Sequence, residues 1–306
     1  MLMKKQTIQN DKNPERLEME LITDTDAGSG LKGIWSRFRK HKMAVISLFV
    51  IVTLILIALL APLISPYDPN AVDPINRLAG PNAAHLLGQD QLGRDILSRI
   101  IWGSRVSLSV GFLAGSISLV VGVVLGALAG FYGGWVDNVI MRVAEIFVTI
   151  PQFLLVIAVV AALGPSLNNL LIVIGLTSWN SYARQVRAKV MQIKQLDYTE
   201  AARALGCDDK RIIFKHILPN AVVPIIVTAT LNIASVILLE SSLTFLGFGA
   251  QPPQSTWGSI LNEGRAYILN ASHICTYPGI AIMITVLSFN LMGDGLRDAL
   301  DPKMKI

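Results

Sequence analysis

Long apolar runs alternate with polar segments along the 306 residues of the chain. The first run, residues 43–64, is uninterrupted and long enough for a helix that crosses a bilayer, which needs about 20 apolar residues. Further runs cover residues 106–130, 139–163, 170–182, 221–248 and 278–296. The pattern predicts an all-α integral membrane protein with six transmembrane helices.

The second and third runs contain residues that shape helix packing. Glycines recur at four-residue intervals in the second run, at Gly111 and Gly115 and again at Gly122, Gly126 and Gly130. Such a face lets two helices approach closely, either within the chain or at a contact with another subunit. Pro151 interrupts the third run, so we expect a break in that helix.

Composition and charge agree with a membrane protein. The chain is 52% hydrophobic and only 15% charged, outside the usual range of soluble domains. Of its 26 Lys and Arg residues, 21 fall in segments that would be cytoplasmic if the amino terminus is cytoplasmic, against 5 on the other side. This bias predicts that both termini are cytoplasmic.

The same orientation divides the chain into regions. Residues 1–42 form an amino-terminal cytoplasmic tail, 43–64 the first transmembrane helix, 65–105 an external segment, 106–296 a five-helix core, and 297–306 a carboxyl-terminal tail. Residues 94–102 alternate apolar and charged side chains and are expected to form an interfacial helix. A cleaved signal peptide is the alternative for 43–64, although the run exceeds the roughly 7–15 apolar residues of such signals.

Residues 196–220, LDYTEAARALGCDDKRIIFKHILPN, form the longest polar interruption of the core. Asp197 with Glu200 three residues later predicts a capped helix start, and Gly206 predicts its end. Asp208 or Asp209 then caps a second helix that finishes before Pro219. Small side chains at Ala201, Ala202 and Ala204 would let another protein approach the first helix closely.

A DNA-binding helix-turn-helix shares this arrangement of alanines, a turn glycine and a second helix. A recognition helix needs polar side chains that reach base edges, whereas residues 210–217 are largely apolar. The apolar runs on both sides also favour a membrane protein, so no nucleic-acid partner is expected.

The spacing Glu200-Ala201-Ala202, three residues, Gly206, eleven residues, Leu218-Pro219 resembles the EAA loop of bacterial ATP-binding-cassette import permeases. In that family the loop is a cytoplasmic coupling helix that sits in a groove of a separate ATPase subunit. His216, two residues before Leu218, is similar to peptide-type members. The resemblance implies ATPase coupling by Glu200, Ala201, Ala202, Gly206, His216, Leu218 and Pro219.

Three other stretches resemble one branch of these permeases, the second membrane subunit of dipeptide, oligopeptide and nickel importers. They are residues 86–111, 247–268 and 291–303. The resemblance implies a type I importer permease in the bacterial cytoplasmic membrane. Its implied partners are a second, homologous permease, two ATPase subunits that bind ATP and Mg²⁺, and an external solute-binding protein. We favour short peptides as substrate, with nickel or glutathione as alternatives.

Motifs for catalysis are absent from the sequence. It has no G-x-x-x-x-G-K-[ST], G-x-S-x-G or H-E-x-x-H pattern, so we expect no catalytic residue, metal site or cofactor in this chain. The predicted topology separates Cys207 and Cys275 across the membrane, so no disulfide is expected between them.

Four polar residues in or near the predicted spans are candidates for the translocation path, because polar groups in a membrane are costly. Glu240 either faces the path and meets the amino end of a peptide or is a hydrogen-bonded acid at a helix contact. Glu145 is either a path residue or the partner of Arg142 one turn earlier. Asn180 and Asn232 are expected to line the path.

An ion-coupled secondary transporter that works alone is a second class of function. Such transporters usually have inverted repeats and buried carboxylates for ion coupling. This sequence shows no evident repeat and has one large cytoplasmic loop, a combination that favours the ATP-driven class.

Overall fold

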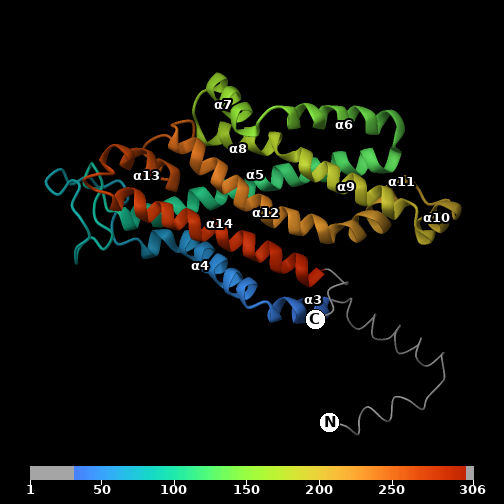
Figure 1. Ribbon diagram of the computed structural model, residues 1–306, viewed down its shortest axis with the longest axis horizontal. Helices are drawn as coiled ribbons and strands as arrows, with labels where there is room; N and C mark the ends of the chain where they lie inside the picture. Colours follow the sequence, from blue (N-terminus) through green and yellow to red (C-terminus); the bar gives the residue numbers. More distant parts are fainter. Residues whose placement is uncertain (1–30, 301–306) are drawn as a thin grey trace, which may run out of the picture.

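The computed structural model describes residues 31–300, and four long helices dominate it. These are α4 (Lys42–Ile64), α5 (Ile96–Tyr132), α12 (Leu218–Phe245) and α14 (His273–Leu300). They run side by side along the long axis of the molecule (Figure 1). The predicted tail regions 1–30 and 301–306 lie outside the described residues, and the short helix α3 (Leu31–Lys40) precedes α4.

The first predicted span coincides with α4, which begins one residue earlier than the apolar run. Its side chains join those of α5, α12 and α14 in one buried apolar cluster, which includes Ile51, Leu108, Ile237 and Phe289. The all-helical class is therefore confirmed. The described residues contain no β-strand, only an isolated bridge between Gln89 and Asp95.

The second predicted span is part of a longer helix than expected. The prediction of a separate interfacial helix at residues 94–102 is wrong, because α5 starts at Ile96 and continues without a break to Tyr132. The Asp95 carboxylate caps this helix by accepting a hydrogen bond from the Ser98 amide at 2.7 Å. Arg99 is only 1% exposed, so its side chain faces the protein and not the membrane surface.

The glycines of α5 pack within the chain. A Cβ atom at Gly122, Gly126 or Gly130 would lie 2.4–2.9 Å from atoms of α9 (Trp179–Lys194), several of them backbone atoms. Because the glycines have no side chain, the two helices can approach at backbone distance. Of the two alternatives for this face, the structure shows packing inside the chain.

The third predicted span is broken at Pro151, as expected. Helices α6 (Gly134–Thr149) and α7 (Gln152–Leu163) meet there at an angle of 90°. The fourth falls in α8 (Leu167–Thr177) and the start of α9, with Ser178 between them. By length and composition, four described helices can each cross a membrane, or five if the bent pair counts as one span.

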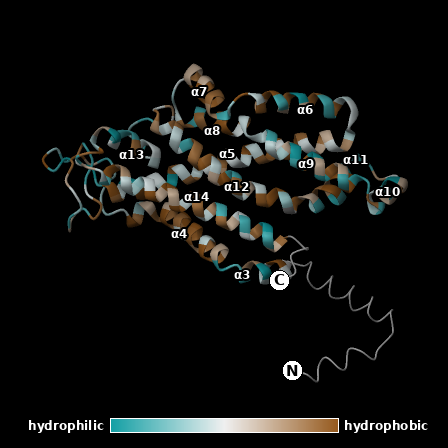
Figure 2. Ribbon diagram, in the orientation of Figure 1, coloured by the Kyte–Doolittle hydropathy of each residue, from teal (hydrophilic) through white to brown (hydrophobic). Residues whose placement is uncertain are grey.

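The two ends of the molecule have different contents. The segment between α4 and α5 lies at one end with α13 (Trp257–Gly264) and η2 (Arg265–Tyr267), and α10 (Asp197–Ala204) lies at the opposite end (Figure 1). Figure 2 shows apolar residues along α4, α7 and α8 and polar residues around α10. Helix α14 begins at His273, five residues before the predicted start of the last span at Pro278.

Candidate functional site

A polar cavity of about 290 Å³ lies between α9 and α12, with a contribution from the start of α7. Thr228, Asn232 and Ser235 of α12 are spaced four and three residues apart, so one face of that helix lines it. The remaining lining residues are Gln152, Ser178, Asn180, Ser181, Leu231, Val236 and Leu239. All of these side chains are uncharged, so the cavity offers amides and hydroxyls together with aliphatic groups.

Several lining side chains are held by hydrogen bonds. Gln152 Nε2 donates to Ser178 Oγ at 2.6 Å, which fixes the start of α7 on the junction of α8 and α9. Thr228 Oγ1 donates to Gln185 Oε1 at 2.6 Å, which joins α12 to α9. The hydrogen bonds between these helices therefore fix the walls of the cavity relative to one another. Sequence reasoning missed Gln152 and Ser178, which lie at helix junctions.

Asn180 and Asn232, two of the four candidates for the translocation path, line this cavity, whereas the two acids lie elsewhere. Glu240 is fully buried and accepts hydrogen bonds from Ser107 (3.3 Å), Ser241 (3.2 Å) and Thr244 (3.0 Å). It points from α12 towards α5, so it matches the alternative of a hydrogen-bonded acid at a helix contact.

Glu145 lies on the exposed side of α6 and is not among the residues that line the cavity. Its carboxylate pairs with the Arg142 guanidinium at 2.9 Å, one turn earlier on the same helix. The ion pair expected from their spacing is confirmed.

The first half of the 196–220 loop is the helix α10. Its amino-terminal cap is Leu196, and no described side chain caps the first turn, so the predicted capping box of Asp197 and Glu200 is wrong. The helix starts one residue earlier than that motif requires. Glu200 and Ala201 are exposed, whereas Ala202 is buried. Gly206 has a φ of +78°, the left-handed conformation expected where a glycine ends a helix.

The second half does not end before Pro219. One turn, α11 (Asp209–Arg211), leads into a π-helix, η1 (Ile212–Ile217), and then directly into α12. Asp208 is at the cap position, but within the described residues its side chain forms no capping hydrogen bond. Pro219 is tolerated because the first turn of a helix leaves its amide groups without partners anyway.

His216 and Leu218 lie on one continuous helical path, His216 in η1 and Leu218 at the start of α12. His216 is partly buried, and its backbone oxygen accepts a hydrogen bond from Asn220 Nδ2 at 2.6 Å. Leu218 packs against the buried cluster that joins the loop to the core.

That cluster anchors the loop to α5 and α9. Ala202, Ile212 and Ile217 pack with Phe131 and Val190 in it. Lys194 Nζ also donates to the Phe131 carbonyl oxygen at 2.5 Å, and its ammonium lies 5.5 Å from the centre of the Phe131 ring. The loop is thus fixed to the helices behind it.

Two large apolar side chains of the loop are exposed. Leu205 is 85% exposed and Phe214 is 70% exposed, beside the charged residues Asp208 and Lys215. Exposed apolar side chains with a polar rim are typical of a protein contact. The sequence did not predict that Leu205 and Phe214 form an exposed contact surface.

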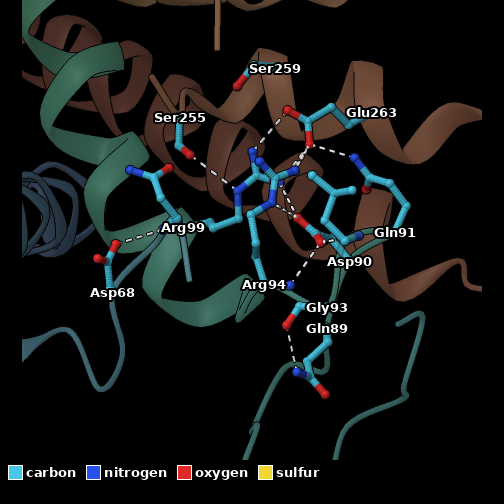
Figure 3. A network of polar contacts seen from close by, with 12 residues as sticks. Asp68, Gln89, Asp90, Gln91, Gly93, Arg94, Arg99, Ser255, Ser259 and Glu263 are labelled. Atoms are coloured by element: carbon cyan, nitrogen blue, oxygen red, sulfur yellow. Dashed lines mark hydrogen bonds and ion pairs between the residues drawn. The ribbon is translucent and has the colours of Figure 1, made fainter. Parts of the chain in front are cut away.

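A buried ion-pair network holds the opposite end of the molecule together (Figure 3). Arg99 Nη1 lies 2.5 Å from Asp90 and 2.9 Å from Glu263, and Arg94 also pairs with both carboxylates. Burial opposes ionisation of Glu263, but the charges of Arg99 and Arg94 outweigh it and lower the pKa of this carboxyl. Arg99 Nε further donates to Ser255 Oγ at 3.2 Å. The network joins the segment before α5 to α13. The sequence did not predict these ion pairs, because Glu263 is far from Arg94 and Arg99 along the chain.

Residues 122–306 match the family described as the binding-protein-dependent transport system inner membrane component. The chain belongs to this permease family. Residues 29–81 also match the N-terminal transmembrane domain of oligopeptide transport permease C. The resemblance read from the sequence is therefore confirmed.

Similar permeases cover nearly the whole chain. The dipeptide transport system permease protein DppC of Alkalihalophilus pseudofirmus is 47% identical over 271 residues, 89% of each chain. The glutathione transport system permease protein GsiD of Pectobacterium atrosepticum is 43% identical, covering 94% of this chain and 96% of its own. GsiD of Escherichia coli O6:K15:H31 is 45% identical, with 94% and 95% covered.

A solved structure has the same fold. The MetNI methionine transporter in inward-facing conformations matches with a TM-score of 0.55 at 21% identity, over 67% of this chain and 97% of that chain. The chain is thus a multi-pass membrane permease of an ATP-binding-cassette importer, a class of transport proteins and not of enzymes. Such permeases work with ATPase subunits and a solute-binding protein.

Proposed function

We propose that this permease forms half of the translocation path of an importer of short peptides, and that residues 196–220 couple the path to ATPase subunits. The observation that supports the proposal most directly is that the loop is connected at both ends to helices that line the cavity. Helix α9 lines the cavity at Asn180 and leads into α10, and η1 leads into α12, which lines the cavity at Asn232. A force applied to the loop therefore reaches both walls of the cavity through continuous helices.

The exposed face of the loop is suited to an ATPase subunit. Glu200, Ala201 and Gly206 lie on the surface together with the apolar side chains of Leu205 and Phe214. The buried cluster behind them makes the loop and the ends of α5 and α9 one packed unit. Closure of two ATPase subunits would then move this unit as a rigid body and rock the helices.

The chemistry of the cavity favours a peptide. Neutral amides and hydroxyls can pair with peptide N–H and C=O groups whatever side chains the peptide carries. The relatives named for dipeptide and glutathione transport support this class of substrate. Nickel is the weaker alternative, because amides and hydroxyls are poorer ligands for it than imidazole or thiolate.

The proposed assembly has a second, homologous permease that completes the path, two ATPase subunits that bind ATP and Mg²⁺, and an external binding protein. The distribution of Lys and Arg supports cytoplasmic termini, with the α10 end inside and the α13 end outside.

The first experiment is mild solubilisation of the native membrane, purification of this chain and identification of its partners by mass spectrometry. We expect a second permease and one or two ATPases. Recovery of the chain alone, or as a homo-oligomer, would favour a secondary transporter. Peptide uptake should also stop when ATP is depleted with the membrane potential kept intact.

The cavity is tested by Asn232→Leu, which removes an amide without much change in volume. We expect the apparent KM for a dipeptide to rise about tenfold, as for the loss of one or two hydrogen bonds. Ser242→Ala, on the same helix but outside the cavity, is the control. Glutathione and Ni²⁺ added as competitors would identify the substrate: inhibition by Ni²⁺ alone would contradict the peptide assignment.

A further inference from the structure

A second cavity, of about 460 Å³, lies at the opposite end of the molecule from the coupling loop. Its walls come from the segment that follows α4, from α5, from the first residue of α8 and from the loop that precedes α13. The polar and aromatic side chains that line it are Asn70, Trp102, Arg105, Ser109, Gln254 and Ser255. None of its lining residues belongs to the cavity between α9 and α12.

Arg105 gives this cavity a charge that the first cavity lacks. Its side chain is exposed, and its guanidinium lies 6.0 Å from the centre of the Trp102 ring. Among the described residues, Arg94 and Arg99 form ion pairs with carboxylates, whereas Arg105 forms none. A guanidinium beside an aromatic ring and without a carboxylate partner is suited to bind a carboxylate from outside the chain.

The walls of the cavity are fixed in place before any ligand arrives. Ser255 accepts the hydrogen bond from Arg99, so the loop before α13 is tied to the buried ion-pair network (Figure 3). On the other side, the Tyr67 amide donates to Ser98 Oγ at 3.1 Å, which holds the segment with Asn70 against α5. Because the walls are already ordered, binding of a ligand does not carry the entropic cost of ordering them.

We propose that this cavity is an outer binding site for the terminal carboxylate of the incoming peptide. Arg105 binds the carboxylate, Asn70 and Gln254 supply amides for the adjoining peptide bond, and Trp102 contacts the last side chain. The inference rests on the proposed function, because it requires a peptide substrate. It adds a charged recognition step ahead of the neutral cavity between α9 and α12.

The test is direct binding of a peptide to the purified complete transporter in lipid nanodiscs, without the external binding protein. The probes are radiolabelled alanyl-alanine and its carboxyl-terminal amide. Arg105→Ala should weaken binding of the free acid about 10- to 100-fold, the usual effect of losing hydrogen bonds to a charged group. It should leave binding of the amide unchanged. Arg265→Ala, an exposed arginine at the same end that does not line the cavity, is the matched control.

Three results would overturn the proposal. They are no binding of the free acid to the unaltered transporter, equal binding by the Arg105→Ala variant, and an equal loss for acid and amide. Peptide uptake by cells with the unaltered chain tests the proposed function separately: uptake that persists while the binding test fails removes the outer site alone.

Discussion

Two glycines of α5, Gly126 facing α9 and Gly115 facing α12, give opposite predictions for the stability of the protein when each is replaced by alanine. At Gly126, a Cβ atom would lie 2.5 Å from the Ala183 carbonyl oxygen and 2.9 Å from Ala183 Cα. Backbone atoms cannot rotate away, so the helices must separate. We place the cost of Gly126→Ala in the upper part of the range for overpacking, about 2–3 kcal/mol.

Alanine also restricts the unfolded chain more than glycine does, which offsets about 0.5–1 kcal/mol within a helix. The net loss of stability for Gly126→Ala is therefore about 1–2.5 kcal/mol. At Gly115, the new Cβ would meet Ile233 Cγ1 at 3.5 Å, an ordinary contact. Gly115→Ala should thus stabilise the protein by about 0.5–1 kcal/mol.

The assay is the thermal unfolding midpoint of the purified transporter in one detergent, followed by intrinsic fluorescence, with the unaltered protein alongside. We expect the Gly126→Ala midpoint to fall and the Gly115→Ala midpoint to rise. Equal midpoints for the two variants, or a lower one for Gly115→Ala, would refute packing of α9 against the glycine face of α5.

Three further predictions concern the loop, the buried acid and the ion-pair network. Gly206→Pro should abolish peptide uptake without loss of membrane insertion, because proline is fixed near a φ of about −65° and cannot adopt the +78° found here. Ala201→Trp should also abolish uptake, because the larger side chain would block the approach of an ATPase. Normal uptake by either well-expressed variant would count against coupling through this loop. Glu240→Gln should change the rate of uptake by less than about twofold, both for peptides with a free amino end and for peptides with an acetylated one, because the Glu240 carboxylate already has three hydroxyl donors in the protein. A loss of uptake only for peptides with a free amino end would indicate that Glu240 acts in the translocation path. The Glu263 carboxyl has a lowered pKa, so the stability that its ionised form contributes is present above the usual pKa of 4.5 and is lost as the pH falls below it. The unfolding midpoints of the unaltered protein and of Glu263→Gln should therefore converge in acid. A constant difference between the two midpoints at every pH would contradict this account.

The apolar pattern predicted the long helices because composition alone decides which segments a bilayer accepts. It could place α4 within one residue, and the four-residue spacing of glycines indicated close helix packing. Pro151 likewise indicated a break, because proline disrupts a helix wherever it is packed. These features depend on local sequence.

The errors arose where distant residues decide the structure. Arg94 and Arg99 have the spacing of an interfacial helix, and only the approach of Glu263, more than a hundred positions away, buries them. Asp197 with Glu200 has the spacing of a capping box, but the turn from α9 makes Leu196 the cap. Asn180 and Asn232 stood out in the sequence because amides are rare in apolar runs, and both line the cavity between α9 and α12. Arg105, in contrast, resembled any other external arginine.

The π-helix before α12 sets the rotational phase between the coupling loop and the cavity. Hydrogen bonds there span five residues, as from the Leu218 amide to the Ile213 oxygen, so this turn holds one more residue than an α-helical turn. If the same residues of η1 adopted α-helical hydrogen bonding, the rest of α12 would turn by about 100° relative to the loop. Thr228 and Asn232 would then leave the cavity while every helix remained intact. The π-helical turn therefore keeps the loop and the cavity in register. Deletion of one residue within η1 would leave an α-helical turn in nearly the same phase, whereas a deletion between Leu218 and Thr228, where the helix is already α-helical, would turn Thr228 and Asn232 away by about 100°.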